Sequence, residues 1–364
     1  MRSSVCLAVF ALLCLASPAH SQGDAGSLHL LGFTDFNYLA TDQPVAQGFR
    51  EGQLAGHLTA GLTDRITFFA EVTATATAAG FNLEVERTVL RYDVLDALKL
   101  SAGRYHTPVS YWNTAYHHGQ WLQTSVARPE LIRGGGAVLP VHFVGVMAEG
   151  SFPTGPLGLG YAAGIGNGRH THIGRAGDAG DANSSRAWVV SGHARPPRLF
   201  GLQVGGSVYG DRISVPSRDA VDERIVSAHL AWSRETPELL AEYARVLHRP
   251  RGGETTRTDA YYAQLGYRLP GGARALKPYL RAERVAVSED DPVFAAAGLD
   301  REVAIAGIRY DFAPVAALKA EYRRERLDSP ELFNTLALQL SFTFGGSHQT
   351  AVAHGAPETT ESDP

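Results

Sequence analysis

The strongest constraint on the fold is an alternation of apolar and polar residues with a period of two, the pattern of a β-strand with two unlike faces. In TLALQLSFTF, residues 335–344, every second residue from Leu336 onward is Leu or Phe, and the others are Ala, Gln, Ser or Thr. The same period recurs in RITFFAEVTATAT (65–77), VAIAGIRYDF (303–312) and ALKAEYRRE (317–325). Ten residues at about 3.3 Å each have the length of a tilted strand that crosses a bilayer. The pattern therefore predicts β-strands that are long enough to span a membrane.

The two faces of these segments differ in a way that indicates which side meets lipid. One face carries Ala, Gly, Val and Leu with aromatic residues near the strand ends, whereas the other mixes Glu, Arg, Lys and Gln. The core of a water-soluble sandwich is usually richer in large residues, and a lipid-facing band around a wet lumen has the composition seen here. Because periodicity alone cannot tell inside from outside, a soluble β-sandwich or β-helix stays open as the alternative.

The number and spacing of the candidate strands point to a closed barrel. An even count is typical of bacterial barrels, as are short turns at one end and long loops at the other. From the second strand on, the connections alternate between short and long, with the brief 78–80 as the exception. We therefore expect an all-β fold, a transmembrane antiparallel up-and-down β-barrel of about sixteen strands. The sixteen predicted strands are 28–39, 51–61, 65–77, 81–92, 97–105, 137–149, 157–166, 186–195, 201–212, 222–233, 237–248, 258–269, 275–287, 301–312, 315–326 and 335–344.

The first residues have the three-part pattern of an export signal. Arg2 supplies a positive start, residues 5–15 are apolar, and small residues follow up to Ser21. A buried N-terminal helix is the alternative interpretation. Both cysteines, Cys6 and Cys14, lie in this segment, so we expect the exported chain to have no disulfide and no thiol. The expected organisation is a signal peptide over 1–21, a barrel over 22–344 and a disordered tail over 345–364.

Charge excludes one class of partner. The chain has 33 Lys and Arg against 37 Asp and Glu, a formal net charge of −4, and it has no basic stripe. Nucleic acid is therefore not an expected partner. The near balance also means that bulk charge does not indicate which ions would be preferred.

The longest predicted connection, 106–136, contains an unusual segment, YWNTAYHHGQWLQ (111–123). Sixteen strands enclose a barrel wide enough for an aqueous channel. We expect this loop to fold inward and to form a constriction, because its aromatic residues allow it to pack stably inside the barrel. The residues expected to hold it are Tyr111, Trp112, Tyr116 and Trp121.

The arrangement resembles the sixteen-stranded bacterial outer-membrane porins, and GRYHTPVSYWNTAYHHG (103–119) resembles a segment of porins related to the phosphate-selective porin O/P group. The resemblance implies an outer-membrane channel for passive diffusion of small hydrophilic solutes or ions, without a cofactor and commonly a homotrimer. The chain departs from the group in two ways. Acidic and basic residues are mixed where the phosphate-selective members have a strongly basic lumen, and the chain continues beyond Phe344, where such barrels usually end on Phe.

The candidate site residues belong to the loop and to the polar faces of the strands. Basic residues of the loop opposite acidic residues of the early strands would create a transverse field that orients solutes. Ordinary lumen residues paired for solvation are the alternative. Strict alternation from Leu98 and Leu100 would place Arg104 outside the lumen, unless the strand bulges near Gly103. The expected constriction residues are Arg104, His106, Tyr111, Trp112, Asn113, Tyr116, His117, His118, Trp121, Arg128, Glu130 and Arg133, and the expected lumen wall residues are Glu71, Glu84, Glu86, Arg309, Lys319, Glu321 and Arg323.

The sequence also contains candidates for metal binding and for hydrolysis. On an extended backbone His117 and His118 would point to opposite faces, so we expect them to pin the loop to the wall by hydrogen bonds, or to line the pore as groups that titrate near neutrality, and not to bind a metal. A shared metal would need a turn there and further ligands, for which His106, His170 and His172 are available. Ser207 and His229 could meet as a hydrolase pair, but no motif surrounds them. Two other classes of function stay open, a non-conducting barrel that sheaths a partner protein or exported polymer, and an outer-membrane hydrolase.

Overall fold

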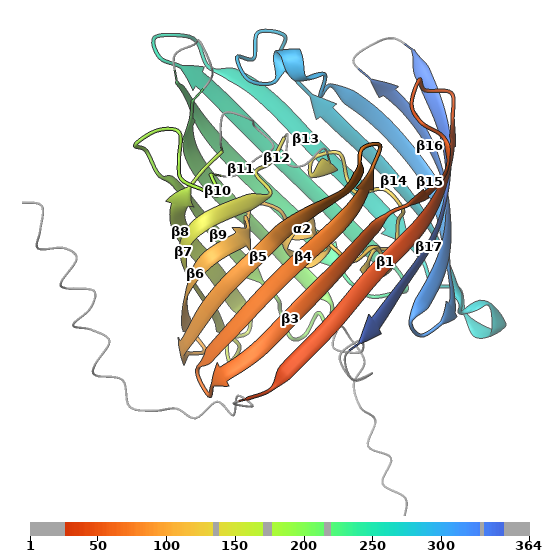
Figure 1. The fold of residues 1–364 in the computed structure, drawn as a ribbon, viewed down its shortest axis with the longest axis horizontal. Helices are drawn as coiled ribbons and strands as arrows, with labels where there is room; N and C mark the ends of the chain where they lie inside the picture. The colour runs from red at the N-terminus through yellow and green to blue at the C-terminus, as the bar shows by residue number, and fades with distance from the viewer. Residues whose placement is uncertain (1–25, 134–137, 170–176, 215–219, 328–330, 346–364) are drawn as a thin grey trace, which may run out of the picture.

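The computed structural model describes residues 26–133, 138–169, 177–214, 220–327 and 331–345, and these form one antiparallel β-barrel (Figure 1). The described connections contain four short helical segments: α2 (Tyr111–Ala115), η2 (Gln120–Leu122), η3 (Gly271–Ala273) and η4 (Ala295–Ala297). Within the described residues, no helix combines the length and the apolar character needed to cross a bilayer. The strands are β1 (Leu28–Thr41), β2 (Gly48–Glu51), β3 (Gln53–Thr63), β4 (Ile66–Thr77), β5 (Gly80–Leu95), β6 (Leu98–His106), β7 (His142–Phe152), β8 (Leu159–Asn167), β9 (Ala187–Ala194), β10 (Leu202–Ile213), β11 (Val221–Trp232), β12 (Glu238–Pro250), β13 (Thr256–Gly266), β14 (Leu276–Ala286), β15 (Arg301–Ala313), β16 (Ala316–Leu327) and β17 (Leu332–Gly345).

These strands form a closed barrel of sixteen staves, as the sequence predicts. β2 and β3 are separated only by Gly52, and both pair with β1, so they are two parts of one stave. Each further strand pairs with its neighbour along the chain, and β1 pairs with β17 over Leu31–Thr41 to close the circle. Each predicted strand overlaps one observed stave. The largest differences lie at strand ends, as at the start of β7, which begins at His142 and not at 137.

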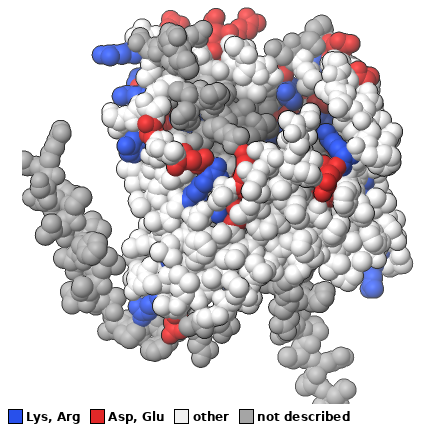
Figure 2. All heavy atoms as spheres, in the orientation of Figure 1, with Lys and Arg blue, Asp and Glu red and all other residues white. Residues whose placement is uncertain are grey.

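The apolar faces point outward. In β17, Leu336, Leu338 and Leu340 are 46%, 40% and 36% exposed, whereas Gln339 and Ser341 between them are 2% and 0% exposed. This is the reverse of a water-soluble sandwich, in which the large apolar side chains are covered. On the face drawn in Figure 2, a broad band across the lower half of the barrel is nearly free of charged residues. The barrel therefore has an apolar outer belt and a polar interior, which fits a lipid surround.

The strict alternation is broken at one place next to the lumen. The register between β4 and β5 shifts at Glu71 and Val72, which adds a bulge at Glu86. Both Glu86 and its neighbour Arg87 then make contacts on the lumen side, since Arg87 Nε lies 2.5 Å from Glu71 Oε2. A bulge of this kind redirects side chains at a barrel wall.

Gly103 in β6 lies close to the same bulge. Its φ is +147°, and a Cβ at this position would lie 1.9 Å from the Thr88 carbonyl oxygen. Only glycine fits such a close approach of two backbones. Arg104 can point inward only where the strict alternation is interrupted. Two features interrupt it here, the bulge at Glu86 in β5 and the close backbone approach at Gly103 in β6.

The connections are unequal at the two ends of the barrel. Short turns such as 64–65 and 96–97 lie at one end, and longer loops such as 287–300 lie at the other. The longest connection runs over 107–141, and its described residues, 107–133 and 138–141, are called the inner loop below. It carries α2, which lies within the barrel behind β4 in the view of Figure 1.

Candidate functional site

The inner loop is closed at its neck by main-chain and amide hydrogen bonds. Thr107 N–H donates to the Val141 carbonyl at 2.8 Å. The Asn113 Nδ2 group donates to both the Thr107 and the Val141 carbonyls at 2.9 Å, and Asn113 is fully buried. Because one side chain binds both ends of the loop, the neck stays narrow and the rest of the loop enters the barrel as a unit.

A wall carboxylate receives the start of α2. The Ser110 side chain accepts a hydrogen bond from Asn113 N–H, as an N-cap does. The next amides donate to Glu242 on β12, with distances of 2.7 Å from Tyr111 N and 2.8 Å from Trp112 N. Tyr262 Oη donates to the same carboxylate at 2.9 Å. Glu242 therefore satisfies amides that the first turn of a helix leaves without an intrahelical partner.

Aromatic residues of the inner loop pack against the wall and against each other. Trp112 is fully buried, and its ring lies 5.2 Å from that of Tyr116 and 6.0 Å from that of Tyr262. The guanidinium of Arg281 lies 5.8 Å from the Trp112 ring, and that of Arg309 lies 5.7 Å from the Trp121 ring. These cation–π and aromatic contacts fix the loop to one side of the barrel.

Basic residues of the wall bind carbonyl groups of the loop. Arg309 Nη1 donates to the Trp121 and Gln123 carbonyls at 2.6 and 2.8 Å. Lys319 Nζ donates to the Gln120 carbonyl at 2.6 Å. Both residues, which the alternation predicts for the lumen wall, are largely covered because the loop lies on them.

The second half of the loop is held by an alternating set of acids and bases. Val126 N–H donates to Glu321 Oε2 at 2.9 Å, and Glu130 N–H donates to Glu283 Oε2 at 2.5 Å. The Glu130 carboxylate pairs with Arg133 and Arg323. Burial acts to raise the pKa of Glu130, but the nearby arginines outweigh it and lower that pKa to about 2. This carboxylate is therefore an ion at neutral pH.

A cavity of about 580 Å³ remains between the inner loop and the opposite wall, which is made by β1, β2, β4, β16 and β17. Arg128 and Arg133 line it from the loop, and Asp35 and Glu51 line it from β1 and β2. The predicted acids Glu71, Glu84 and Glu86 are not among its lining residues. Burial lowers the pKa of Arg128, and the charges of Glu86, Asp35 and Glu71 oppose that shift. Arg128 thus interacts with the acidic wall from within the loop.

The predicted wall acids lie beside a group of histidines. Glu71 Oε1 lies 2.7 Å from His57 Nε2, and Glu84 pairs in register with Thr73, so it shares that lumen-facing side. Glu86 is surrounded by His106 at the end of β6, His142 at the start of β7, and His117 and His118 of the inner loop. These five residues, Glu86, His106, His117, His118 and His142, are called the histidine cluster below.

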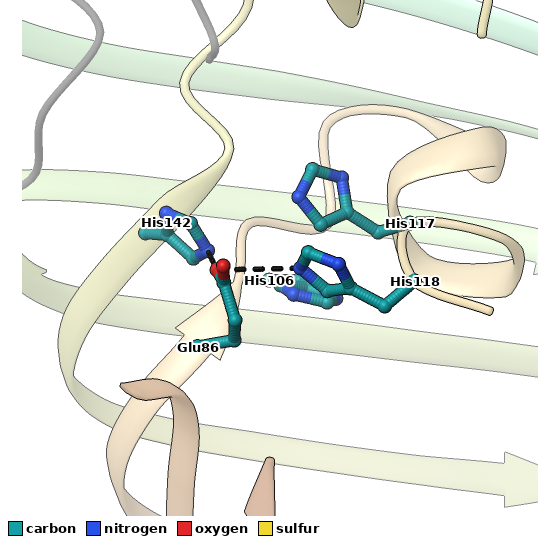
Figure 3. A group of neighbouring side chains, drawn as sticks. All are labelled: Glu86, His106, His117, His118 and His142. Carbon is teal, nitrogen blue, oxygen red and sulfur yellow. Dashed lines mark ion pairs between the residues drawn. The ribbon is translucent and has the colours of Figure 1, made fainter. Parts of the chain in front are cut away.

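The expectation that His117 and His118 point to opposite faces is wrong. The chain bends between α2 and Gly119, whose φ is +87°, and the two rings lie 4.3 Å apart (Figure 3). His170 and His172, the other predicted partners, lie outside the described residues. The sequence pattern did not indicate His142, although its position opposite His106 in the β6–β7 ladder brings the two rings within 5.4 Å.

The remaining candidates have other partners. Arg104 Nε lies 2.7 Å from Asp178 Oδ1, so it ties a neighbouring loop to the wall. Ser207 Oγ lies 2.7 Å from Ser227 Oγ, and His229 Nε2 lies 3.0 Å from Gln203 Nε2. Ser207 and His229 both line a cavity of about 220 Å³ beside α2, but each has its own hydrogen-bond partner.

Several residues that position the loop were not predicted. Glu242, Arg281 and Glu283 are 5%, 2% and 4% exposed and bind the loop directly. Their inward positions follow from the same alternation that identified Glu321, so the signal was present. What the alternation could not show is which lumen residues the loop would reach.

No known family model matches the chain, and no curated protein sequence matches it. Its structure is similar to solved outer-membrane proteins. The anion-selective porin from Comamonas acidovorans matches with a TM-score of 0.64 and 13% identity, over 88% of this chain and 100% of that chain. The outer membrane channel DcaP of Acinetobacter baumannii matches with a TM-score of 0.59 and 13% identity, over 90% of this chain and 100% of that chain. The trimer form of OmpT from Vibrio cholerae matches with a TM-score of 0.57 and 13% identity, over 88% of this chain and 100% of that chain. The chain thus has the closed sixteen-stave barrel fold of Gram-negative outer-membrane porins.

Proposed function

We propose that this chain is an outer-membrane porin, a passive diffusion channel for small hydrophilic solutes or ions, with no enzymatic activity. The observation that carries the proposal is the inner loop, which lies inside a closed barrel and leaves a cavity of about 580 Å³ with charged walls. A barrel of sixteen strands would otherwise be a wide hole, and a loop that narrows it allows size and charge to decide what passes.

The constriction is formed by the inner loop and the wall of β1, β2, β16 and β17. Arg128 and Arg133 lie on the loop side, and the wall side carries four acids and two bases: Asp35, Glu51, Glu321, Glu325, Arg50 and Arg323. The excess of acids on the wall opposite the basic loop side creates a field across the passage, which orders water and orients dipolar solutes. His106 contacts His117 of the inner loop and Arg104 binds Asp178 of a neighbouring loop, while Glu71 and Glu86 act on the charge of Arg128.

Finer assignments rest on similarity. The relation to the phosphate-selective porin O/P group is supported by the segment 103–119, and the mixed charge of the cavity gives no support to phosphate as the solute. A homotrimer is supported by the likeness to OmpT, whose matched structure is a trimer form. Export through a cleaved signal peptide, 1–21, completes the proposal.

Single-channel recording in a planar bilayer tests the function. The refolded full chain is expected to give stable current steps, and Arg128→Glu is expected to shift the reversal potential in a salt gradient toward cations. Arg251→Glu makes the same charge change on an exposed loop, away from the cavity, and is the matched control. Folded protein that carries no current would overturn the channel. Equal reversal potentials for both variants would overturn the assigned constriction.

A further inference from the structure

The histidine cluster has the arrangement of a metal centre. One ligand atom from each of its five residues lies within 4.8 Å of the corresponding atom of every other. Glu86, His106, His117 and His118 are 3%, 7%, 5% and 5% exposed, so the site is nearly closed to water. Figure 3 shows the Glu86 carboxylate between His142 and His118, with His106 and His117 beside it.

Hydrogen bonds around the cluster orient its ligand atoms. His118 Nδ1 lies 2.7 Å from Gln53 Oε1, and Gln53 Nε2 donates to Thr75 Oγ1 at 2.9 Å, so His118 carries its proton on Nδ1. Its Nε2 then faces the cluster as a lone pair. Thr73 Oγ1 donates to Glu86 Oε1 at 2.9 Å and leaves Oε2 directed at the histidines. Outer contacts of this kind fix the tautomer and direction of metal ligands.

The ligand atoms that face one another in the histidine cluster lack hydrogen-bond partners, as judged from the described part of the chain. Glu86 Oε2 lies 3.3 Å from His118 Nε2 and 2.7 Å from His142 Nε2. Within the described part of the chain, His106 Nε2 and His117 Nδ1 are buried without a hydrogen-bond partner. Lone pairs that converge in a dry space are costly unless a cation joins them.

We propose that the histidine cluster binds a divalent first-row transition-metal ion, of which zinc fits the ligands best. Imidazole nitrogens with one carboxylate are typical zinc ligands, and the cluster offers no thiolate. Tetrahedral bonds of about 2.0–2.1 Å place neighbouring ligands roughly 3.4 Å apart. Small rotations of the rings would close the present spacing to that value.

The charges that face the site are compatible with a dication. Arg87, Arg104 and Arg128 are the bases that act on the cluster. Arg87 is paired with Glu71 at 2.5 Å, and Arg104, whose Nη1 lies 3.8 Å from Glu86 Oε2, is bound to Asp178. Two of the three positive charges therefore have an acidic partner outside the cluster, which leaves Glu86 to face the ion.

The position of the site indicates what the metal does. His106 and His142 are opposite each other in the β6–β7 ladder, where the inner loop leaves and rejoins the wall. His117 and His118 come from the loop itself, and Glu86 comes from β5. A bound ion would therefore fasten the loop to the wall and fix the constriction in one position.

Zinc binding by the full chain tests the proposal. The folded protein in detergent is stripped with a chelator, equilibrated with zinc alone, passed through a desalting column and analysed for metal. The expected result is one zinc per chain. Mutation of a residue that only hydrogen-bonds to a metal ligand typically lowers metal affinity 10–100-fold. Because His117→Gln with His142→Gln removes two ligands themselves, we expect the double variant to bind zinc more than about a hundredfold more weakly.

Two controls keep the result decisive. His193→Gln alters a histidine that is not a member of the cluster, although it lines the cavity of about 220 Å³ that His106 also borders, and is expected to leave zinc binding unchanged. Glu86→Gln, of nearly equal shape, replaces the double variant if that protein does not fold. Cobalt in place of zinc is expected to give the visible absorption of a tetrahedral site in the wild type and in His193→Gln, and not in the cluster variants. Wild-type protein that retains no zinc, or variants that bind as the wild type does, would overturn the proposal.

Discussion

At the scale of single residues, Glu130 shows how a buried charge holds the inner loop. Its carboxylate pairs with Arg133, Arg323 and Arg301, and its amide donates to Glu283. An isolated carboxylate in this position would be costly to bury, whereas one surrounded by arginines is stabilised. The residue therefore links the charge of the wall to the position of the loop.

The lowered pKa of Glu130, about 2, gives its stability contribution a defined pH range. The folded pKa lies below the value of about 4.3 for an unperturbed Glu, so the contribution is complete above that value and is lost as pH falls toward 2. We expect Glu130→Gln to lower the free energy of unfolding at pH 7, with the difference from wild type shrinking below about pH 4.5. Urea titrations from pH 7 to pH 3 measure it, and a difference that does not vary with pH would contradict the assignment. Glu254→Gln, on an exposed loop, is the control.

Trp112 tests the packing of the loop. Its ring is fully buried between the loop and β13, and a large buried aromatic replaced by Ala typically costs about 3–5 kcal/mol. We expect Trp112→Ala to loosen the loop and to raise the single-channel conductance and its noise. Trp188→Ala removes an outward tryptophan, 41% exposed, and is expected to leave conductance unchanged. Equal conductance for the two variants would show that Trp112 does not hold the constriction.

At the scale of elements, the strands were predictable and the loop path was not. A period of two fixes which side chains share a face, and Arg309, Lys319, Glu321 and Arg323, all predicted for the lumen side, are all buried. The bulge at Glu86 was not predicted, because no glycine or other residue typical of a bulge stands there. Gly103, on the neighbouring strand β6, is such a residue and did indicate an irregularity. The bend that unites His117 with His118 escaped because it depends on contacts with the wall, such as the His118 bond to Gln53.

The junction between α2 and β12 is the element contact with the simplest test. Glu242 accepts from two α2 amides and from Tyr262, and Gln in its place offers one oxygen and brings an NH2 group toward amide donors. A buried donor left without an acceptor costs about 1–3 kcal/mol. We expect Glu242→Gln to lower the free energy of unfolding by that amount in denaturant titration. Glu254→Gln, on an exposed loop, is again the control. Equal free energies of unfolding for the two variants would show that Glu242 does not hold α2 to β12.

At the scale of the whole molecule, the two faces of one strand distinguish a membrane barrel from a soluble one. Leu338 lies at the middle of β17 and is 40% exposed on the outer face, while its neighbour Ala337 lines the inner cavity. A lysine on the lipid face near the bilayer midplane costs about 2–4 kcal/mol, whereas lumen substitutions change selectivity. We expect Leu338→Lys to destabilise the folded protein in lipid vesicles by that amount.

Ala337→Lys is the matched variant, since it adds the same side chain one residue away. It is expected to fold nearly as well as the wild type and to shift the reversal potential toward anions, because its ammonium enters the cavity of about 580 Å³. Folding is followed by urea titration in vesicles, and selectivity is followed in a planar bilayer. If Leu338→Lys folds as well as Ala337→Lys, the outer face does not meet lipid, and the membrane assignment fails with it. If both variants fold and neither alters the current, the cavity is not the path of the ions.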